Sequence, residues 1–257
     1  MENRKTEGVI FDWAGTTVDY GSFAPVQAFV EVFRHFGIEP TMEEVRKPMG
    51  MLKIDHIRTM LKMERIENCW KEKYGRIPCD EDAQELYGHF EEKLFGILHQ
   101  FADPKPGTVE VVKALKEKGI AIGSTTGYTD RMMNIVAPLA KEKGYVPDAV
   151  VTPDAVGGMG RPWPYMIFRN MEILKLQDVR KVIKVGDTIS DIKEGKHAGV
   201  RSVGLVVGSS QMGLTREEYE ALSPQEAQKT CEKVKKEFLE AGADQVIMNL
   251  EELLELI

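Results

Sequence analysis

Glycine occurs with threonine and with serine or aspartate at three places where a short apolar run ends. They occupy residues 12–17 (DWAGTT), 124–127 (STTG) and 186–191 (GDTISD). The runs before them are typical of buried parallel strands, which all end at the same edge of a sheet. Ligands of doubly wound sheets bind outside that edge. Each cluster alone is a weak signal, but three on successive strands predict one shared pocket.

Asp12 and Asp187 supply carboxylates from two of these strand ends. Mg²⁺ is commonly bound by a few hard oxygen ligands of the protein, keeps several of its water molecules and also binds a phosphoryl group of the substrate. A backbone carbonyl in the turn after Asp12 could add a ligand, and Asp191 could orient metal-bound water or a basic residue. Alternatively, each aspartate caps a helix or turn, which is the commoner role of a single Asp at such a junction. The two together favour the metal.

An anion site is predicted beside the metal. Residues 124–127 place hydroxyls and backbone N–H groups at the start of a helix, where negative charge is favoured. Arg161, in the loop GGMGRPWPYM, could give the same anion a bidentate contact. A salt bridge or a loop anchor is an equally common role for such an arginine.

The elements that must hold these clusters are a first strand near the start of the chain and an alternation of strands and helices along residues 101–257. Strands are expected at 8–13, 120–127, 149–154, 182–188, 201–208 and 246–248, and helices near 109–119, 128–143, 164–174, 192–198, 229–240 and 250–257. This alternation predicts an α/β fold, a doubly wound parallel sheet with helices on both faces.

Residues 21–100 contain no convincing strand and have apolar residues at helical spacing. Helices are expected at 24–36, 41–47, 52–63 and 80–100. The second opens with Thr41 and Glu44, which have the spacing of a capping box. We therefore expect an α/β core of residues 1–20 and 101–257, and an inserted all-helical domain of residues 21–100.

The composition narrows the function classes. The 257 residues carry a net charge of −7, which disfavours nucleic acid or an anionic membrane as a partner. No stretch has the length of a membrane span, and the first residues lack the apolar segment of a signal peptide. The scattered cysteines argue against a disulfide framework and a zinc site. These features predict a cytoplasmic protein that acts on a small molecule.

In their order along the chain, these motifs resemble the haloacid dehalogenase superfamily. The resemblance rests on DxxGTT, STTG, a basic residue before a proline, and GDTxxD, and it covers the whole chain. The helical insertion resembles the cap domain of that superfamily. The resemblance implies that Asp12 is the nucleophile and that Asp12, Asp187 and the Ala14 carbonyl bind Mg²⁺. It also implies that Thr126 binds the phosphoryl oxygens and that Arg161 replaces the usual lysine.

Ala14 departs from the pattern of phosphatases in this superfamily. They carry a second aspartate two residues after the nucleophile, as the general acid that protonates an alkoxide leaving group. Without that acid, we expect a leaving group that needs no protonation by aspartic acid. Carbon is such a group if the electrons of the broken bond have a sink. A protonated lysine imine is a good sink, because it accepts those electrons and becomes an enamine.

The helical insertion offers the lysine. Lys53 lies in RKPMGMLKIDHIR, near the predicted start of a helix, where a neighbouring metal–phosphoryl site would lower its pKa. By itself, such a residue is more commonly a solvated surface lysine. The segments FDWAGTTVDYG, KPMGMLKIDH, GSTTGYT, GRPWPYM and KVGDTISDIKEG, however, are together similar to the phosphonoacetaldehyde hydrolase family.

In that family the lysine at this motif forms a Schiff base with the substrate aldehyde. The resemblance implies cleavage of the C–P bond of phosphonoacetaldehyde to acetaldehyde and phosphate, in 2-aminoethylphosphonate degradation, by a homodimer. It also implies that Met49, Gly50, His56 and Tyr128 lie near the reacting atoms, although packing within the cap is an equal alternative for Met49 and His56. Some members carry cysteine where this chain has Ser22, which puts a thiol role in doubt.

Three other functions compete with this interpretation. A phosphatase or phosphomutase acting on a small phosphate ester is the nearest, and Ala14 argues against it. A haloacid dehalogenase would need neither a Mg²⁺ site nor Asp187. A non-catalytic binding protein would have no need for Asp12, Asp187, Thr126 and Lys53 together.

Overall fold

The computed structural model describes residues 5–257 and contains one parallel sheet. Its six strands lie in the order β3-β2-β1-β4-β5-β6, which confirms the doubly wound α/β class predicted from the sequence. The strands are β1 (Gly8–Phe11), β2 (Ala121–Thr125), β3 (Ala149–Val151), β4 (Val182–Gly186), β5 (Arg201–Leu205) and β6 (Gln245–Ile247).

The strand order explains why the three polar clusters can meet. β1 lies between β2 and β4, and Phe11 at its end is in register with Ser124 of β2 and Val185 of β4. The residues that follow these three positions therefore leave the sheet side by side, at the edge where a doubly wound sheet binds its ligands.

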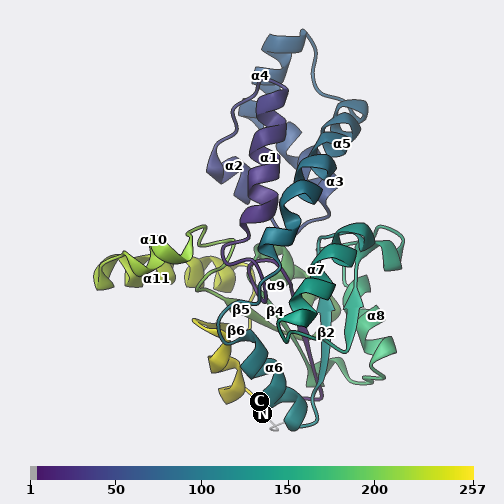
Figure 1. The fold of residues 1–257 in the computed structure, drawn as a ribbon, viewed down its shortest axis with the longest axis vertical. Helices are drawn as coiled ribbons and strands as arrows, with labels where there is room; N and C mark the ends of the chain where they lie inside the picture. The colour runs from purple at the N-terminus through teal and green to yellow at the C-terminus, as the bar shows by residue number, and fades with distance from the viewer. Residues whose placement is uncertain (1–4) are drawn as a thin grey trace.

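Helices cover both faces of the sheet (Figure 1). Side chains alternate across a strand, so Val9 and Phe11 of β1 pack in one apolar cluster and Ile10 packs in another. The first cluster includes residues of α6 (Thr108–Glu117) and α7 (Asp130–Glu142). The opposite face is covered by α8 (Tyr165–Ile173), α9 (Ile189–Ala198) and α11 (Pro224–Glu240), with the short α10 (Arg216–Glu220) and 3₁₀ turns η2 (Pro153–Val156) and η3 (Val179–Lys181) in the connections.

The segment between β1 and β2 is helical, as predicted, and Figure 1 shows it standing above the sheet. It contains α1 (Phe23–His35), α2 (Met42–Arg46), α3 (Lys53–Leu61), α4 (Glu64–Tyr74), α5 (Asp80–Ile97) and the 3₁₀ turn η1 (Leu98–Phe101). We call it the helical block. Thr41 and Glu44 form the predicted capping box of α2. The helix α4 was not predicted. The division of the chain into core and cap domains stays a prediction.

One expected helix takes a different form. Residues 250–257 were predicted as a closing helix, and the structure has a 3₁₀ helix, η4 (Leu250–Glu255). Leu250 and Leu253 are its buried residues, and their spacing of three matches the three-residue turn of a 3₁₀ helix. This short, tight helix thus buries both leucines on the same side.

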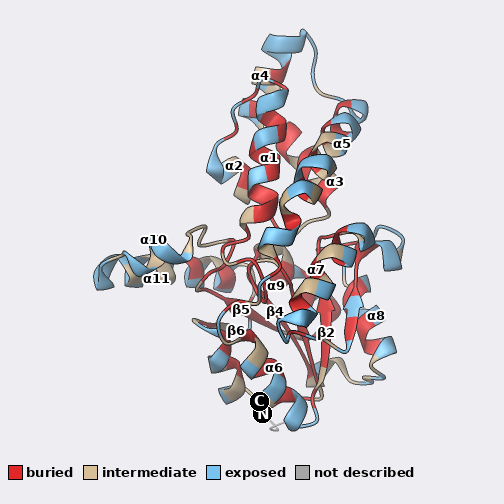
Figure 2. Ribbon diagram, viewed as in Figure 1, coloured by how far each residue is buried: buried red, intermediate tan, exposed pale blue. Residues whose placement is uncertain are grey.

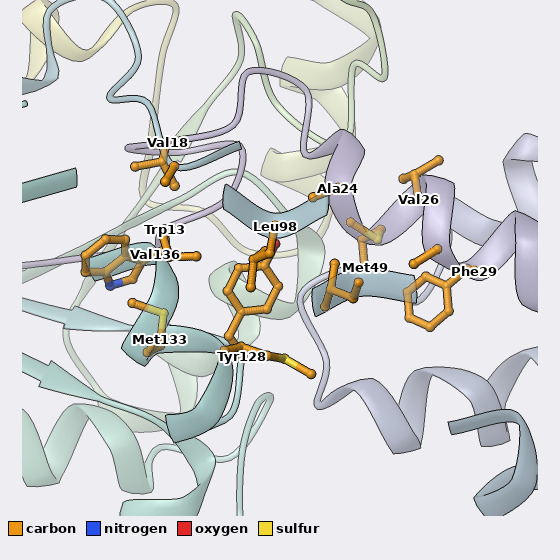
Figure 3. Packing of buried hydrophobic residues seen from close by; sticks show 14 of the residues in the cluster. Trp13, Val18, Ala24, Val26, Phe29, Met49, Leu98, Tyr128, Met133 and Val136 are labelled. Carbon is orange, nitrogen blue, oxygen red and sulfur yellow. The ribbon is translucent and has the colours of Figure 1, made fainter. Parts of the chain in front are cut away.

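Apolar packing is continuous from the sheet into the helical block. Figure 2 shows the central strands and the inward helix faces largely buried, with most of the exposed residues on the outer faces of the helices and in loops. One cluster joins Phe11 of β1 to Phe29 of α1, and Tyr128 belongs to it as well. Figure 3 shows the Tyr128 ring with Met49 of the helical block on one side and Met133 of α7 on the other. The helical block is therefore packed down on the sheet. No helix of residues 5–257 is long and apolar enough to cross a membrane.

Candidate active site

A small cavity lies between the helical block and the ends of the central strands. Its volume is about 20 Å³, which is room for roughly one water molecule. Residues from five separate parts of the chain line it: Asp12, Ala14, Ser22, Met49, Gly50, Lys53, Thr126, Gly127, Tyr128, Arg161 and Thr188. The structure thus brings together most of the site residues that the sequence predicted.

Carboxylate oxygens of Asp12, Asp187 and Asp191 lie within 4.8 Å of one another, and all three residues are buried. Asp187 accepts hydrogen bonds from the Thr16 hydroxyl (2.8 Å) and the Ser210 backbone N–H (2.7 Å). Burial, and then the negative charges of Asp12 and Asp191, hold the pKa of Asp187 well above its usual value. A buried carboxylate that two others repel is a place where a cation would be stabilised.

Gly15 allows the backbone to approach this carboxylate. Its φ is +91°, and a Cβ atom there would lie 2.0 Å from Oδ2 of Asp187. Any side chain would therefore collide with the second predicted metal ligand. The glycine in DxxGTT is thus required by the contact between the turn after β1 and the end of β4.

Asp191 has a different environment from the other two aspartates. Its Oδ1 lies 3.0 Å from Nη1 of Arg161 and 2.8 Å from Nζ of Lys184, and Oδ2 accepts a hydrogen bond from the Thr188 hydroxyl (2.6 Å). Arg161 and then Lys184 lower its pKa against the effect of burial. Asp191 also completes the capping box of α9, so it orients basic residues and caps a helix at once.

The donor set therefore fits a divalent cation held by Asp12 and Asp187. Both are hard oxygen donors at adjacent strand ends, and Asp187 accepts its two hydrogen bonds from neutral groups, the Thr16 hydroxyl and the Ser210 N–H. Asp191 is already satisfied by two cationic side chains. Ala14 lines the same cavity.

Lys53 is the first residue of α3 and only 3% exposed. Its Nζ lies 5.1 Å from the centre of the Tyr128 ring. Burial lowers its pKa to about 8, and the negative charge of Asp12 opposes that fall. The sequence predicted a lowered pKa from the helix N-terminus and the metal–phosphoryl site, whereas burial is the main cause in the structure.

Arg161 touches the predicted nucleophile directly. Its Nη1 lies 2.7 Å from Oδ1 of Asp12, its Nε lies 2.9 Å from Oε2 of Glu194, and its Nη2 donates to the Thr125 hydroxyl (2.8 Å). These charges hold the pKa of Arg161 above its usual range, although burial acts against them. The guanidinium is thus held among carboxylates beside the cavity, and its contact with a substrate anion stays a prediction.

The remaining cavity walls come from the helical block and the loop after β2. Gly50 has a φ of +84°, and a Cβ there would lie 2.3 Å from Oγ1 of Thr188, so the block can approach the sheet only with glycine at this position. The Thr126 hydroxyl accepts a hydrogen bond from the Tyr128 backbone N–H (3.0 Å). The buried Tyr128 hydroxyl has no hydrogen-bond partner within residues 5–257.

With this geometry established, comparisons with known proteins define the family. Residues 6–199 match the model of the haloacid dehalogenase-like hydrolases. The chain is 51% identical over 97% of its length to the phosphonoacetaldehyde hydrolase of Bacillus mycoides, of which it covers 94%. The chain belongs to the phosphonoacetaldehyde hydrolase family of haloacid dehalogenase-like hydrolases.

Two further relatives agree with this membership. A bifunctional phosphonoacetaldehyde hydrolase/aminoethylphosphonate transaminase of Clostridioides difficile is 52% identical over 97% of the chain, which spans 39% of that longer protein. The crystal structure of a phosphonoacetaldehyde hydrolase-like protein from Oleispira antarctica superimposes with a TM-score of 0.94. It is 39% identical, and the match covers 98% of this chain and 92% of that one.

The family resemblance singled out His56 and Ser22, and only Ser22 lines the cavity. His56 is buried but does not line the cavity, and its ring stacks on Phe29 with centroids 3.8 Å apart. Burial and the charge of Lys53 lower its pKa well below the usual value, so it is neutral. Ser22 does line the cavity and has a φ of 54°.

Several buried charged residues around the site were not predicted from the sequence. They are Asp19, Lys105, Lys184 and Glu194, with the largely buried Arg46 beside them. Lys105 bonds to the carbonyls of Gly15, Val207 and Gly208. A lysine inside the apolar run VIKVG was the one available signal, because a charge in a central strand needs a buried partner.

Proposed function

We propose that this chain is a phosphonoacetaldehyde hydrolase that cleaves the C–P bond to give acetaldehyde and phosphate. The observation that carries the proposal is Lys53, a buried amine with a pKa of about 8 in the same small cavity as Asp12. A phosphate ester hydrolase needs a general acid for its leaving group, and Ala14 stands where that acid would be. The identity of 51% to enzymes named for this reaction supports the same substrate.

Lys53 begins the reaction. Its neutral amine adds to the aldehyde carbon, the adduct takes up a proton from solvent and loses water, and a protonated imine forms. Tyr128 stays protonated because burial, reinforced by Asp19 and Asp12, raises its pKa well above 10.0. Its unpartnered hydroxyl is therefore placed to donate a hydrogen bond to an oxygen atom of the substrate in this cavity.

Asp12 then attacks phosphorus. The P–C bond breaks, its electron pair moves into the iminium, and the products are an aspartyl phosphate and a lysine enamine. Thr126 and the backbone N–H groups of its loop stabilise the phosphoryl oxygens. Water hydrolyses the aspartyl phosphate to phosphate, and protonation and hydrolysis of the enamine release acetaldehyde and the free amine.

Asp12, Asp187 and the Ala14 carbonyl are the groups that would hold Mg²⁺. When bound, the ion offsets negative charge on the carboxylates and on the phosphoryl oxygens. Arg161 fixes Oδ1 of Asp12, as its 2.7 Å contact indicates, and so orients the carboxylate. Asp191 holds Arg161 and Lys184 in place.

The helical block, residues 21–100, serves as the cap of a core formed by residues 1–20 and 101–257. A cavity of about 20 Å³ is too small for phosphonoacetaldehyde, so the block must move away from the sheet to admit it. Met49 and Gly50 then close the cavity over the bound aldehyde, while His56 packs on Phe29 within the block. We expect a homodimer, which light scattering of the purified protein would detect.

The function is tested by measuring phosphate release from phosphonoacetaldehyde and from a panel of sugar phosphates, with Mg²⁺ present. We expect turnover of the phosphonate alone, and its loss in Lys53→Arg, which keeps a positive charge but cannot form an imine. Lys62→Arg, an exposed lysine at the end of α3, is the matched control and should retain full activity. Turnover of phosphate esters that survives Lys53→Arg would instead identify a phosphatase.

A further inference from the structure

The cluster behind Arg161 has no role in the reaction described so far. Glu194 lies on α9, one helical turn after Asp191, and is fully buried together with Lys184. Its Oε2 is 2.9 Å from Nε of Arg161 and 3.5 Å from Nζ of Lys184. Burying a carboxylate is unfavourable unless its charge is compensated, so Glu194 must interact with these two cations.

The contacts around Glu194 form a closed ring. The Thr125 hydroxyl donates to Oε2 of Glu194 (3.0 Å) and accepts from Nη2 of Arg161 (2.8 Å). Because Nε of Arg161 also donates to Oε2, two of the three nitrogens of the planar guanidinium are held in place. The third nitrogen, Nη1, is left directed at Asp12 and Asp191, at 2.7 and 3.0 Å.

We infer that Glu194 is a positioning residue for the C–P cleavage reaction, which holds Arg161 so that Nη1 orients the carboxylate of Asp12. Glu194 does not line the cavity and acts only through Arg161. A lysine in place of Arg161 would have no Nε–H group to donate to Oε2 of Glu194. The inference rests on the proposed role of Asp12 as nucleophile.

The first test is a double-mutant cycle on phosphonoacetaldehyde turnover. Glu194→Ala should lower kcat roughly 10- to 100-fold, the range found when the outer partner of a metal ligand is removed, while KM changes little. In the Arg161→Lys background the same substitution should change kcat less than about twofold, because the bond to Nε is already absent. Equal fold losses in both backgrounds would overturn the inference.

Two controls separate positioning from general damage. Lys193→Ala alters the exposed neighbour of Glu194 on the same helix and should leave kcat unchanged. Glu194→Gln keeps an oxygen that can accept from Arg161, so it should retain more activity than Glu194→Ala. A different result would overturn the inference. If kcat and the unfolding midpoint fall together, and by the same amount in Glu194→Ala and Glu194→Gln, Glu194 has only a structural role.

The second test does not depend on activity. The Nε–H resonance of Arg161 in ¹⁵N-arginine-labelled protein is assigned by its disappearance in Arg161→Lys. It should shift in Glu194→Ala and stay closer to its original position in Glu194→Gln. An unchanged resonance in Glu194→Ala would refute the positioning contact, whereas wild-type protein inactive on phosphonoacetaldehyde would refute the proposed function and leave this contact intact.

Discussion

The lowered pKa of Lys53 determines how much of it can form an imine at neutral pH. Free lysine, with a pKa of 10.5, is neutral in only about 0.03% of molecules at pH 7. With a pKa of about 8, roughly 9% is neutral, so burial raises the reactive fraction about 300-fold. We predict that the rate of borohydride trapping with an aldehyde rises with pH and levels off above about pH 8.

Replacing Asp12 separates the causes of this shift. Asp12 raises the pKa of Lys53 against the burial effect, so Asp12→Asn should move the trapping profile to lower pH. Trapping is measured with acetaldehyde in the presence of EDTA, so that no added cation contributes. Asp130→Asn, at the start of α7 and outside the cavity, is the control and should leave the profile in place. A profile that levels off near pH 10, or that Asp12→Asn moves upward, would refute this account of Lys53.

Three further outcomes are expected. Lys53→Met should stabilise the fold at pH 7 by about 1 to 3 kcal/mol in urea unfolding, since a buried amine whose pKa falls from 10.5 to about 8 destabilises the folded state below pH 8. That gain should shrink as the pH rises from 8 to 10.5, and no gain would contradict the burial of the amine. Gly50→Ala should lower kcat/KM at least tenfold because its Cβ would lie 2.3 Å from Thr188, whereas Gly88→Ala, with open space around it, should have no effect on kcat/KM. Chelation should abolish phosphate release and Mg²⁺ should restore it, while trapping of Lys53 continues; full activity in EDTA would exclude the proposed metal role.

The sequence predicted the sheet and the cavity because their signals are local. Apolar runs that end in Asp12 and Asp187 indicate a strand and place a carboxylate at its end, and spacing alone placed α1, α2 and α3 within a few residues of their observed bounds. The strand order could then bring the polar clusters together, since parallel strands end at one edge.

Burial and charge pairing could not be predicted in the same way. The role of Glu194 depends on Arg161 and Thr125, which lie 33 and 69 residues away in the chain. His56 lies three residues after Lys53 in one motif, yet its ring stacks on Phe29 and does not line the cavity. Such partners are set by tertiary packing, which no local pattern encodes.

The most direct test of the central claim compares trapped products in wild-type and Asp12→Asn protein. Each is treated with phosphonoacetaldehyde, Mg²⁺ and borohydride, and the modified peptide is mapped by mass. If Lys53 forms the imine and Asp12 breaks the C–P bond, Lys53 should carry an ethyl group in the wild type and a phosphonoethyl group in Asp12→Asn. Phosphate release without any modification of Lys53, or an ethyl group in both proteins, would contradict the account.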